Sequence, residues 1–381
     1  MPGVAIRGVG LNSALGLDAQ SCVEALLAAG GAPMPLTLQG LAEPVQAGYF
    51  RIPDGADLFD PQRFARLLPA VVQAAAADAR LSAAELRALP VYVGSSCFSV
   101  GRSESDYAAA LAAGSPAAYP MPHCGYGGLA DLARRALGSA GEVFSYNTAC
   151  TSSANALLGA MRALESGRHR HALVIGAELA NRTTLAGFAG LQLLAQRARP
   201  FEAEREGIVL GEAIGAVLLA AEPGADALCL HGGADNCDTH SITTANPDGE
   251  SVLAVSQQAL RRAGLEAAQV RGIKAHGTAS PSSDLAEAAG LRKLFAKLPP
   301  LSVLKPHIGH TLGACGVVEL ILYASALQRG LLPAWAGFGA PDPELGLAPL
   351  TRPVPALAGH YLLNHFGFGG NNAVLVLEKR A

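Results

Sequence analysis

Cys150 lies where a strand pattern gives way to a helical one. The run VFSYNTA ends at Ala149, and the small-residue stretch TSSANALLGAM begins at Thr151. A thiol at such a turn faces the positive end of the helix dipole and free backbone amides, which lower its pKa and favour the thiolate. Its own amide is also placed to donate to an oxyanion. The position alone is consistent with a nucleophile or with a small buried cysteine.

Two histidines occupy comparable places later in the chain. His276 ends the strand pattern GIKAH, and His310 follows the run LSVLKPH. Because α/β sheets bind ligands at the carboxyl ends of their strands, both side chains are candidates for one site. His307 and His310 have the spacing of a metal-binding pair, but no third ligand has a matching spacing, so we expect no metal.

A lysine and three carboxylates accompany these histidines. All five lysines lie in the last third of the chain, and Lys305 stands in an apolar, glycine-rich stretch. A buried lysine needs a partner, for which Glu319 and Glu287 are the candidates. Glu287 shares a predicted helix with Asp284, directly after the loop that His276 opens.

The segment NHFGFGGNN, residues 364–372, is too rich in glycine for an ordinary strand start. It is typical of a loop whose backbone approaches a ligand closely, or simply of a tight turn.

Familiar catalytic motifs are missing. GVGLNS at residues 8–13 imitates the dinucleotide fingerprint, but Ser13 takes the place of its third glycine. The chain contains no GxxxxGK, HExxH or GxSxG pattern. The commonest phosphoryl-transfer, metalloprotease and serine-hydrolase chemistries are therefore excluded.

Composition narrows the class of protein further. Half of the 381 residues are hydrophobic, only 15% are charged, and 44 are glycine, which indicates a large packed core and excludes disorder. A net charge of −3 without a basic stripe argues against nucleic-acid binding. We expect a cytoplasmic protein with no membrane span, because no apolar run reaches about 18 residues. Seven cysteines without a CxxC pair indicate neither a disulfide framework nor a zinc site.

Short Val/Ile-rich runs alternate with Ala/Leu-rich stretches, which predicts an α/β fold with buried strands. The helical stretches 151–167 and 310–330 resemble each other, as do the Gly-led strands 211–222 and 369–380. A duplicated α/β unit is the simplest account. We place the junction near residues 221–227, at Pro223 and Gly224, with a shared interface that holds the site.

Several motifs in order resemble those of the beta-ketoacyl-acyl-carrier-protein synthases of the thiolase-like superfamily. They cover nearly the whole chain and include NTACTSSANAL around Cys150, HGTASPSSDLAE (276–287), KPHIGHTLGACGVVE (305–319) and HFGFGGNNAVL (365–375). The resemblance implies a five-layered α-β-α-β-α fold. Residues 1–223 would form the half with the nucleophile, and residues 224–381 the half with the catalytic histidines and lysine.

The resemblance also assigns roles by position. Cys150 matches the nucleophile, His276 and His310 the two catalytic histidines, Lys305 the buried lysine, and Glu319 its carboxylate neighbour. Asp284 and Glu287 are expected to support the site.

Other positions match the substrate-binding residues of the family. Phe366 resembles the gating phenylalanine, whose amide completes an oxyanion hole with that of Cys150, although His365 before it replaces a small residue. Thr278 and Ser280 match hydroxyls that hold a phosphopantetheine arm. The residues expected near the acyl pocket are Phe188, Cys97 and Phe98.

The implied reaction is a decarboxylative Claisen condensation in fatty acid, polyketide or aryl-polyene synthesis. An acyl group on Cys150 would be extended by malonyl-carrier, with His276 and His310 stabilising the enolate. The expected partner is an acyl carrier protein, docked near Arg63 and Arg66, and no free cofactor is implied. We expect a homodimer, with a heterodimer with a ketosynthase-like subunit as an alternative.

Two other functions stay open at this point. The chain would be a non-catalytic chain-length factor if it only partnered an active ketosynthase, although such partners generally lack the nucleophile. Thiolase-type cleavage with coenzyme A is disfavoured by the two histidines, since thiolases use a second cysteine.

Overall fold

The computed structural model describes residues 3–40, 43–115, 125–222 and 228–380. Within these ranges ten strands form one mixed sheet, in the order β11-β10-β14-β15-β9-β1-β8-β6-β4-β5. Their bounds are β1 (Val4–Asn12), β4 (Val91–Gly94), β5 (Val143–Tyr146), β6 (His171–Glu178), β8 (Ala213–Ala220), β9 (Cys229–Cys237), β10 (Val270–Lys274), β11 (Leu301–Ser302), β14 (Gly359–Phe366) and β15 (Asn371–Lys379).

The sheet consists of two five-stranded halves that join where β1 and β9 pair, at Val4 with Leu230 and Ala5 with Cys229. In the first half β4 runs parallel to β5 and β6, and β8 runs antiparallel to β6 and β1. The second half repeats this pattern, because β10 runs parallel to β11 and β14, and β15 runs antiparallel to β14 and β9. The predicted duplication is therefore present in the topology.

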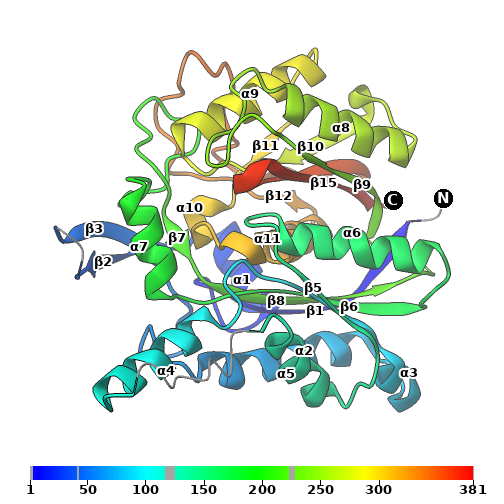
Figure 1. The fold of residues 1–381 in the computed structure, drawn as a ribbon. Coiled ribbons are helices and arrows are strands. Elements are labelled where there is room, and N and C mark those ends of the chain that lie inside the picture. Colours follow the sequence, from blue (N-terminus) through cyan, green and yellow to red (C-terminus); the bar gives the residue numbers. More distant parts are fainter. Residues whose placement is uncertain (1–2, 41–42, 116–124, 223–227, 381) are drawn as a thin grey trace.

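The helices complete five layers. Helices α6 and α11 lie between the half-sheets, α2 and α5 cover the outer face of the first, and α8 and α9 cover the outer face of the second (Figure 1). This is the predicted α-β-α-β-α architecture. The bounds of these helices are α2 (Arg63–Ala79), α5 (Gly128–Leu137), α6 (Ser152–Glu165), α8 (Glu250–Ala263), α9 (Pro281–Leu294) and α11 (Cys315–Gln328).

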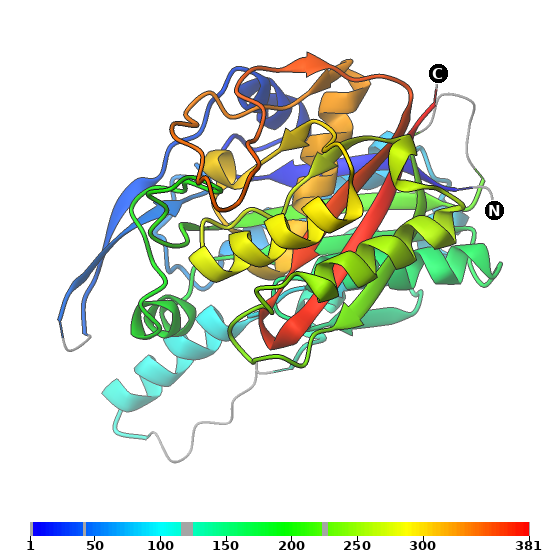
Figure 2. The ribbon, with the colours of Figure 1, turned by 90° about the horizontal axis from the view of Figure 1, so that it is seen from above.

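Smaller elements surround these layers. Figure 2 shows the hairpin of β2 and β3 extending from the body, and helix α4 does the same. The remaining elements are α1 (Ala19–Leu27), β2 (Met34–Leu38), β3 (Val45–Phe50), α3 (Ala83–Ala88), α4 (Val100–Ala112), α7 (Arg182–Gly190), β7 (Leu210–Gly211), α10 (Lys305–Ile308), β12 (Leu331–Leu332) and β13 (Val354–Pro355), with 3-10 turns η2 (Ala267–Gln269), η3 (Leu312–Ala314) and η4 (Phe368–Gly370).

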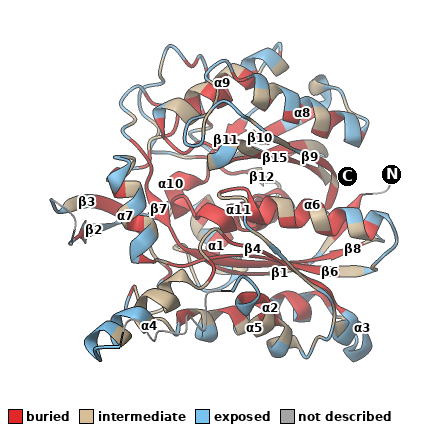
Figure 3. Ribbon diagram, in the orientation of Figure 1, coloured by how far each residue is buried: buried red, intermediate tan, exposed pale blue. Residues whose placement is uncertain are grey.

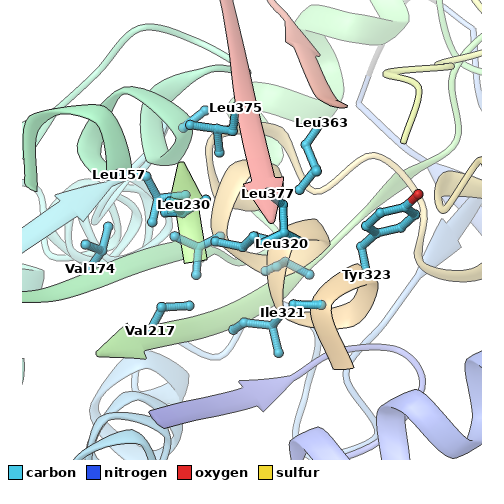
Figure 4. Close-up of a cluster of buried hydrophobic side chains, with 14 of the residues drawn as sticks. Leu157, Val174, Val217, Leu230, Leu320, Ile321, Tyr323, Leu363, Leu375 and Leu377 are labelled. Atoms are coloured by element: carbon cyan, nitrogen blue, oxygen red, sulfur yellow. The ribbon is translucent and has the colours of Figure 1, made fainter. Parts of the chain in front are cut away.

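The core lies around α11, which is nearly all buried and is apolar on most sides, with Glu319 as its charged residue. A helix of that kind must be surrounded by other elements. Leu320 and Ile321 of α11 meet side chains from both half-sheets, including Val217 and Leu377 (Figure 4). Burial is concentrated in the sheets and the two central helices, while the outer helices expose their far sides (Figure 3).

Glycine lets the central layers approach closely. A Cβ at Gly316 of α11 would lie 2.2 Å from the backbone nitrogen of Ala154, and one at Gly94 of β4 would lie 2.2 Å from that of Ser153. Neither position accepts a side chain without moving α6. Helix α6 is thus held against both α11 and β4, and its N-terminal end carries Cys150.

Two sequence expectations differ from the structure. The apolar pattern does not predict β14, because polar residues such as Asn364 and His365 interrupt it, yet both are fully buried at the site. The run 301–307 forms a strand only at its first two residues and then enters α10. The junction at Pro223 and Gly224 falls in residues 223–227, outside the described residues, so the boundary of the halves stays a prediction.

In the described part of the chain, no helix is long and apolar enough to cross a membrane.

Candidate active site

Cys150, His310 and His276 come together in one pocket of about 570 Å³. The Nε2 atom of His310 lies 3.0 Å from the Sγ atom of Cys150. The ring of His276 stands perpendicular to that of His310, with ring centroids 5.3 Å apart. All three side chains are buried. The pocket therefore combines a thiol, an imidazole in contact with it and a second imidazole.

A tight turn presents Cys150 to this pocket. Ala149 before it has a φ of 51°, a left-handed conformation that costs a non-glycine residue energy. The Oγ atom of Ser152 holds the turn, because it donates to the carbonyl of Ala149 at 2.6 Å and accepts from the amide of Thr148 at 3.0 Å. Helix α6 begins at Ser152, so Cys150 lies just before the helix, as its sequence predicts.

The Cys150 thiol is protonated at rest. Burial raises its pKa to about 11, which contradicts the lowered pKa expected from the helix terminus. The Lys305 ammonium and the backbone amides of Phe368 and Cys150 act in the opposite direction, but the loss of solvent outweighs them. Burial also holds the pKa of His310 well below its usual value. His310 is therefore neutral at pH 7 and its Nε2 atom can accept the thiol proton.

Alkylation of Cys150 by iodoacetamide is expected to accelerate steadily from pH 7 to pH 10. The thiolate fraction rises about tenfold per pH unit below a pKa of about 11. Mass spectrometry of the Cys150 peptide after timed exposure gives the rate at each pH. A rate that levels off below pH 9 would contradict the raised pKa.

Lys305 orients His276. Its Nζ atom donates to the His276 carbonyl at 2.6 Å and lies 3.4 Å from His276 Nδ1. An ammonium can only donate, so its approach to Nδ1 favours the tautomer that carries the proton on Nε2. Burial and then Lys305 hold the pKa of His276 well below its usual value, so the ring is neutral. A neutral ring with Nε2–H is an oxyanion donor.

Two buried carboxylates hold the loop that follows His276. Glu287 accepts from the amides of His276 and Gly277 at 2.8 and 2.9 Å. Asp284 accepts from the amides of Thr278 and Ala279, both at 3.1 Å. Both carboxylates therefore support the loop, and Glu287 makes these hydrogen bonds rather than one to Lys305, for which it was a candidate.

The comparisons with known proteins agree with this geometry. Residues 1–225 match the family model described as beta-ketoacyl synthase, N-terminal domain, and residues 228–338 match beta-ketoacyl synthase, C-terminal domain. The chain belongs to the beta-ketoacyl synthase family. The resemblance stated from its motifs is thereby confirmed.

The sequence identity to individual relatives is about one third. The chain is 32% identical over 262 residues to 3-oxoacyl-[acyl-carrier-protein] synthase 2 of Synechocystis, a match that covers 64% of this chain and 63% of that protein. It is 31% identical over 260 residues to the chloroplastic 3-oxoacyl-[acyl-carrier-protein] synthase II of Arabidopsis thaliana, covering 63% of this chain and 48% of the relative. The matches thus span less than two thirds of these relatives.

Solved structures match over nearly the full length. One comes from the complex of a ketosynthase with its chain length factor from Xenorhabdus doucetiae, with a TM-score of 0.86, 26% identity, and coverage of 99% of this chain and 98% of the other. A beta-ketoacyl synthase from Burkholderia phymatum gives a TM-score of 0.84 at 26% identity, with both chains covered completely. The ketosynthase fold predicted from the motifs is confirmed.

This member of the beta-ketoacyl synthase family carries a second buried lysine that the motifs did not single out. Lys274, on β10, forms an ion pair with Glu319 and donates to the carbonyl of Asn364 at 2.5 Å. Glu319 also accepts from Lys305 at 2.8 Å, as the resemblance implied. Burial alone would raise the pKa of Glu319, but the two ammonium groups hold it below its usual value. Two features of the sequence could have identified Lys274 as a site residue: lysine is scarce in this chain, and Lys274 lies two residues before His276.

Removal of Glu319 is expected to cost more stability than removal of Lys274. A Glu319→Gln substitution leaves two buried ammonium groups without a counter-charge, which should cost about 3–5 kcal/mol. Lys274→Met keeps the pair of Glu319 with Lys305 and leaves one carbonyl unpaired, which should cost about 1–2 kcal/mol. Urea unfolding of both variants beside the unmodified chain measures the difference. If Lys274→Met lost as much stability as Glu319→Gln or more, this would contradict the interpretation that one carboxylate neutralises both lysines.

The second backbone amide beside the Cys150 thiol belongs to Phe368, whereas the amide of Phe366 was expected there. The backbone amides that approach the Cys150 thiol belong to Phe368 and to Cys150 itself. Phe366 is still part of β14, paired with Asn372, and its ring packs against His276 at 5.7 Å. Its backbone is committed to the sheet, whereas Phe368 lies in the turn beyond it. A Cβ at Gly367 would lie 3.1 Å from the Cys150 nitrogen, so glycine permits this close approach.

Several hydroxyl side chains line the pocket. Thr278 and Ser280 are among them, together with Ser282, Ser283 and others. Phe188 also lines the pocket, and its ring stacks on that of Phe368 with centroids 5.7 Å apart.

Cys97 and Phe98 do not line this pocket. The Cys97 amide donates to Glu178 at 3.0 Å, and its thiol lies 2.9 Å from the Thr184 hydroxyl. Phe98 packs against Tyr126 instead. Of the three residues expected near an acyl pocket, Phe188 lines the pocket of Cys150, and the acyl-pocket role stays a prediction for all three.

Burial corrects one further expectation, which concerns the docking of a carrier near Arg63. Arg63 is buried in ion pairs with Glu212 and Asp54, so it cannot dock a carrier. Arg66 is exposed but is paired with Asp60. His307 directs its ring nitrogens at the carbonyls of Gly30 and Ala334, rather than toward a site shared with His310.

Proposed function

We propose that this beta-ketoacyl synthase condenses an acyl group held on Cys150 with a malonyl group held on an acyl carrier protein. The observation that carries the proposal is the 3.0 Å contact of His310 Nε2 with Cys150 Sγ, beside a second neutral imidazole in the same pocket. The product would be a 3-ketoacyl thioester for fatty acid or polyketide synthesis.

The first step is acyl transfer. His310 takes the Cys150 proton while the sulfur attacks the acyl-carrier thioester. The amides of Cys150 and Phe368 stabilise the tetrahedral oxyanion. The carrier thiolate leaves and receives the proton from His310, which becomes neutral again.

The second step breaks the bond between the malonyl group and its carboxylate. Carbon dioxide departs and the electron pair forms an enolate, whose oxygen is stabilised by Nε2–H donors of His276 and His310. After the first step the remaining proton of His310 is on Nδ1, so the ring must change tautomer and carry it on Nε2 before the second step; Nδ1 has no hydrogen-bond partner among the described residues that would oppose this change. The carbanion then attacks the acyl carbon, and Cys150 leaves as a thiolate that is reprotonated.

The hydroxyls at the pocket mouth support a carrier-bound substrate. Thr278 and Ser280 are positioned to bind the amide groups of a phosphopantetheine arm that reaches toward Cys150. We propose an acyl carrier protein as the partner and no free cofactor. The cytoplasmic location also remains a prediction.

A reconstitution experiment tests this function. The purified chain is incubated with acyl-carrier and malonyl-carrier, and the carriers are analysed by mass spectrometry. Formation of a 3-ketoacyl-carrier with release of carbon dioxide supports the proposal. No product from any acyl chain, with or without an added ketosynthase-like subunit, would overturn it.

A role as chain-length factor is the second candidate. The likeness to a chain of the ketosynthase and chain length factor complex of Xenorhabdus doucetiae favours a heterodimer with a related subunit. The complete set of Cys150, His276 and His310 supports a catalytic rather than a silent subunit. Activity of the purified chain alone would support a homodimer, and activity that requires both chains would support the heterodimer.

A further inference from the structure

Three potential metal ligands lie outside the catalytic pocket. His231 on β9, His360 on β14 and Glu378 on β15 place their ligand atoms within 4.8 Å of one another. These three strands are neighbours in the sheet. His360 lies six residues before Phe366 on β14, which corresponds to about 20 Å along the strand. The cluster is therefore separate from the pocket that contains Cys150.

The strand register explains why these side chains converge. His360 pairs directly with Glu378 across β14 and β15, so both point to the same face. Between β15 and β9 the register shifts, because Leu377 pairs with Leu230 and Val376 with Gly232. His231 is the extra residue between these pairs. A bulge of this kind re-aims a side chain, and here it directs His231 toward Glu378.

The spacing fits coordination better than a hydrogen bond. His231 Nδ1 lies 3.6 Å from Glu378 Oε2, too far for a hydrogen bond. Ligand atoms about 2.0–2.1 Å from a tetrahedral metal lie about 3.3 Å apart. His231 Nδ1 is also shielded from solvent and makes no hydrogen bond. Buried polar atoms of this kind usually have a partner.

One cationic side chain also contacts the cluster. Arg380 contacts Glu378 Oε2 at 3.4 Å through Nε, so it shares one side of this carboxylate.

We propose that His231, His360 and Glu378 bind one divalent transition-metal ion of the zinc class. Two imidazoles and a carboxylate are a common donor set for such ions, and water would complete the coordination. Because each ligand comes from a different strand, the ion would tie β9, β15 and β14 together at the end of the second half-sheet.

The test uses the full chain after treatment with a chelator, titrated with Zn²⁺ by calorimetry and with Co²⁺ by absorption. We expect one ion per chain and the intense visible bands of four-coordinate Co²⁺. His231→Ala and His360→Ala should each weaken binding by more than about 100-fold, beyond the effect of losing an outer-shell partner. Glu378→Gln, which preserves volume, should also weaken binding, and circular dichroism verifies that each variant folds.

His169→Ala is the matched control. His169 Nε2 lies 3.2 Å from Glu142 Oε2 in a surface pair that has no third ligand among the described residues, so this variant should bind the metal normally. The buried trio His276, Cys315 and His365 also lies within 4.8 Å. Absence of stoichiometric binding, binding unchanged in His360→Ala and Glu378→Gln, or binding abolished by Cys315→Ala alone would each overturn the proposal.

Discussion

Cys150→Ala is expected to reduce condensation by on the order of 10⁴-fold or more, because the acyl group then has no nucleophile to carry it. The substitution removes one sulfur atom from a buried position and leaves both imidazoles in place. Decarboxylation of malonyl-carrier should therefore persist while ketoacyl formation disappears. Both are followed in one assay, by released carbon dioxide and by the mass of the carrier.

The control for this variant is Cys22→Ala. Cys22 is also a buried thiol, but it lies on α1 near Ser13 and outside the pocket. It should keep full activity. Condensation in Cys150→Ala at more than a few per cent of the normal rate would show that another group carries the acyl chain.

The second large effect concerns the two histidines. His276→Ala and His310→Ala are each expected to slow decarboxylation by about 10²–10³-fold, the cost of losing one oxyanion donor. They should differ in the first step. Only His310 lies within proton-transfer distance of Cys150 Sγ, so His310→Ala should also slow acylation, whereas His276→Ala should largely preserve it.

Separate assays of acylation and decarboxylation measure this difference, with the exposed-pair variant His169→Ala as control. Equal effects of both substitutions on acylation would contradict the role of His310 as the base. Unchanged decarboxylation in either variant would remove that histidine from the enolate site.

The sequence predicted the architecture because duplication and buried strands leave strong patterns. The run 213–220 is apolar throughout and forms β8 with those bounds. Cys150 and His310 were also identifiable, since each stands just before a small-residue helix. Their contact could not be derived from spacing, because it joins residues 160 positions apart from the two halves.

Three features of the site could not be predicted from the sequence, because they depend on burial in the folded chain or on the exact residue at which a strand ends. The raised pKa of Cys150 reflects loss of solvent from packing around it, which outweighs the local helix terminus. Phe366 and Phe368 both flank Gly367. Strand β14 ends at Phe366, so the amide of Phe368 lies beyond the strand. The sequence pattern does not show at which residue the strand ends. Lys274 lies in a strand, and the sequence pattern shows only that a charged residue interrupts the apolar run. It does not show that Glu319, from another element, is its partner.

The most direct test of the central claim is the mass of the Cys150 peptide after the purified chain is incubated with acyl-carrier alone. Without malonyl-carrier the reaction should stop after the first step, and the acyl group should remain on this residue as a thioester. The account predicts that the peptide gains the mass of the acyl chain and loses it with hydroxylamine, while peptides containing Cys22 or Cys315 stay unmodified. An unmodified Cys150 peptide with every acyl chain supplied, or an acyl group on another cysteine, would contradict it.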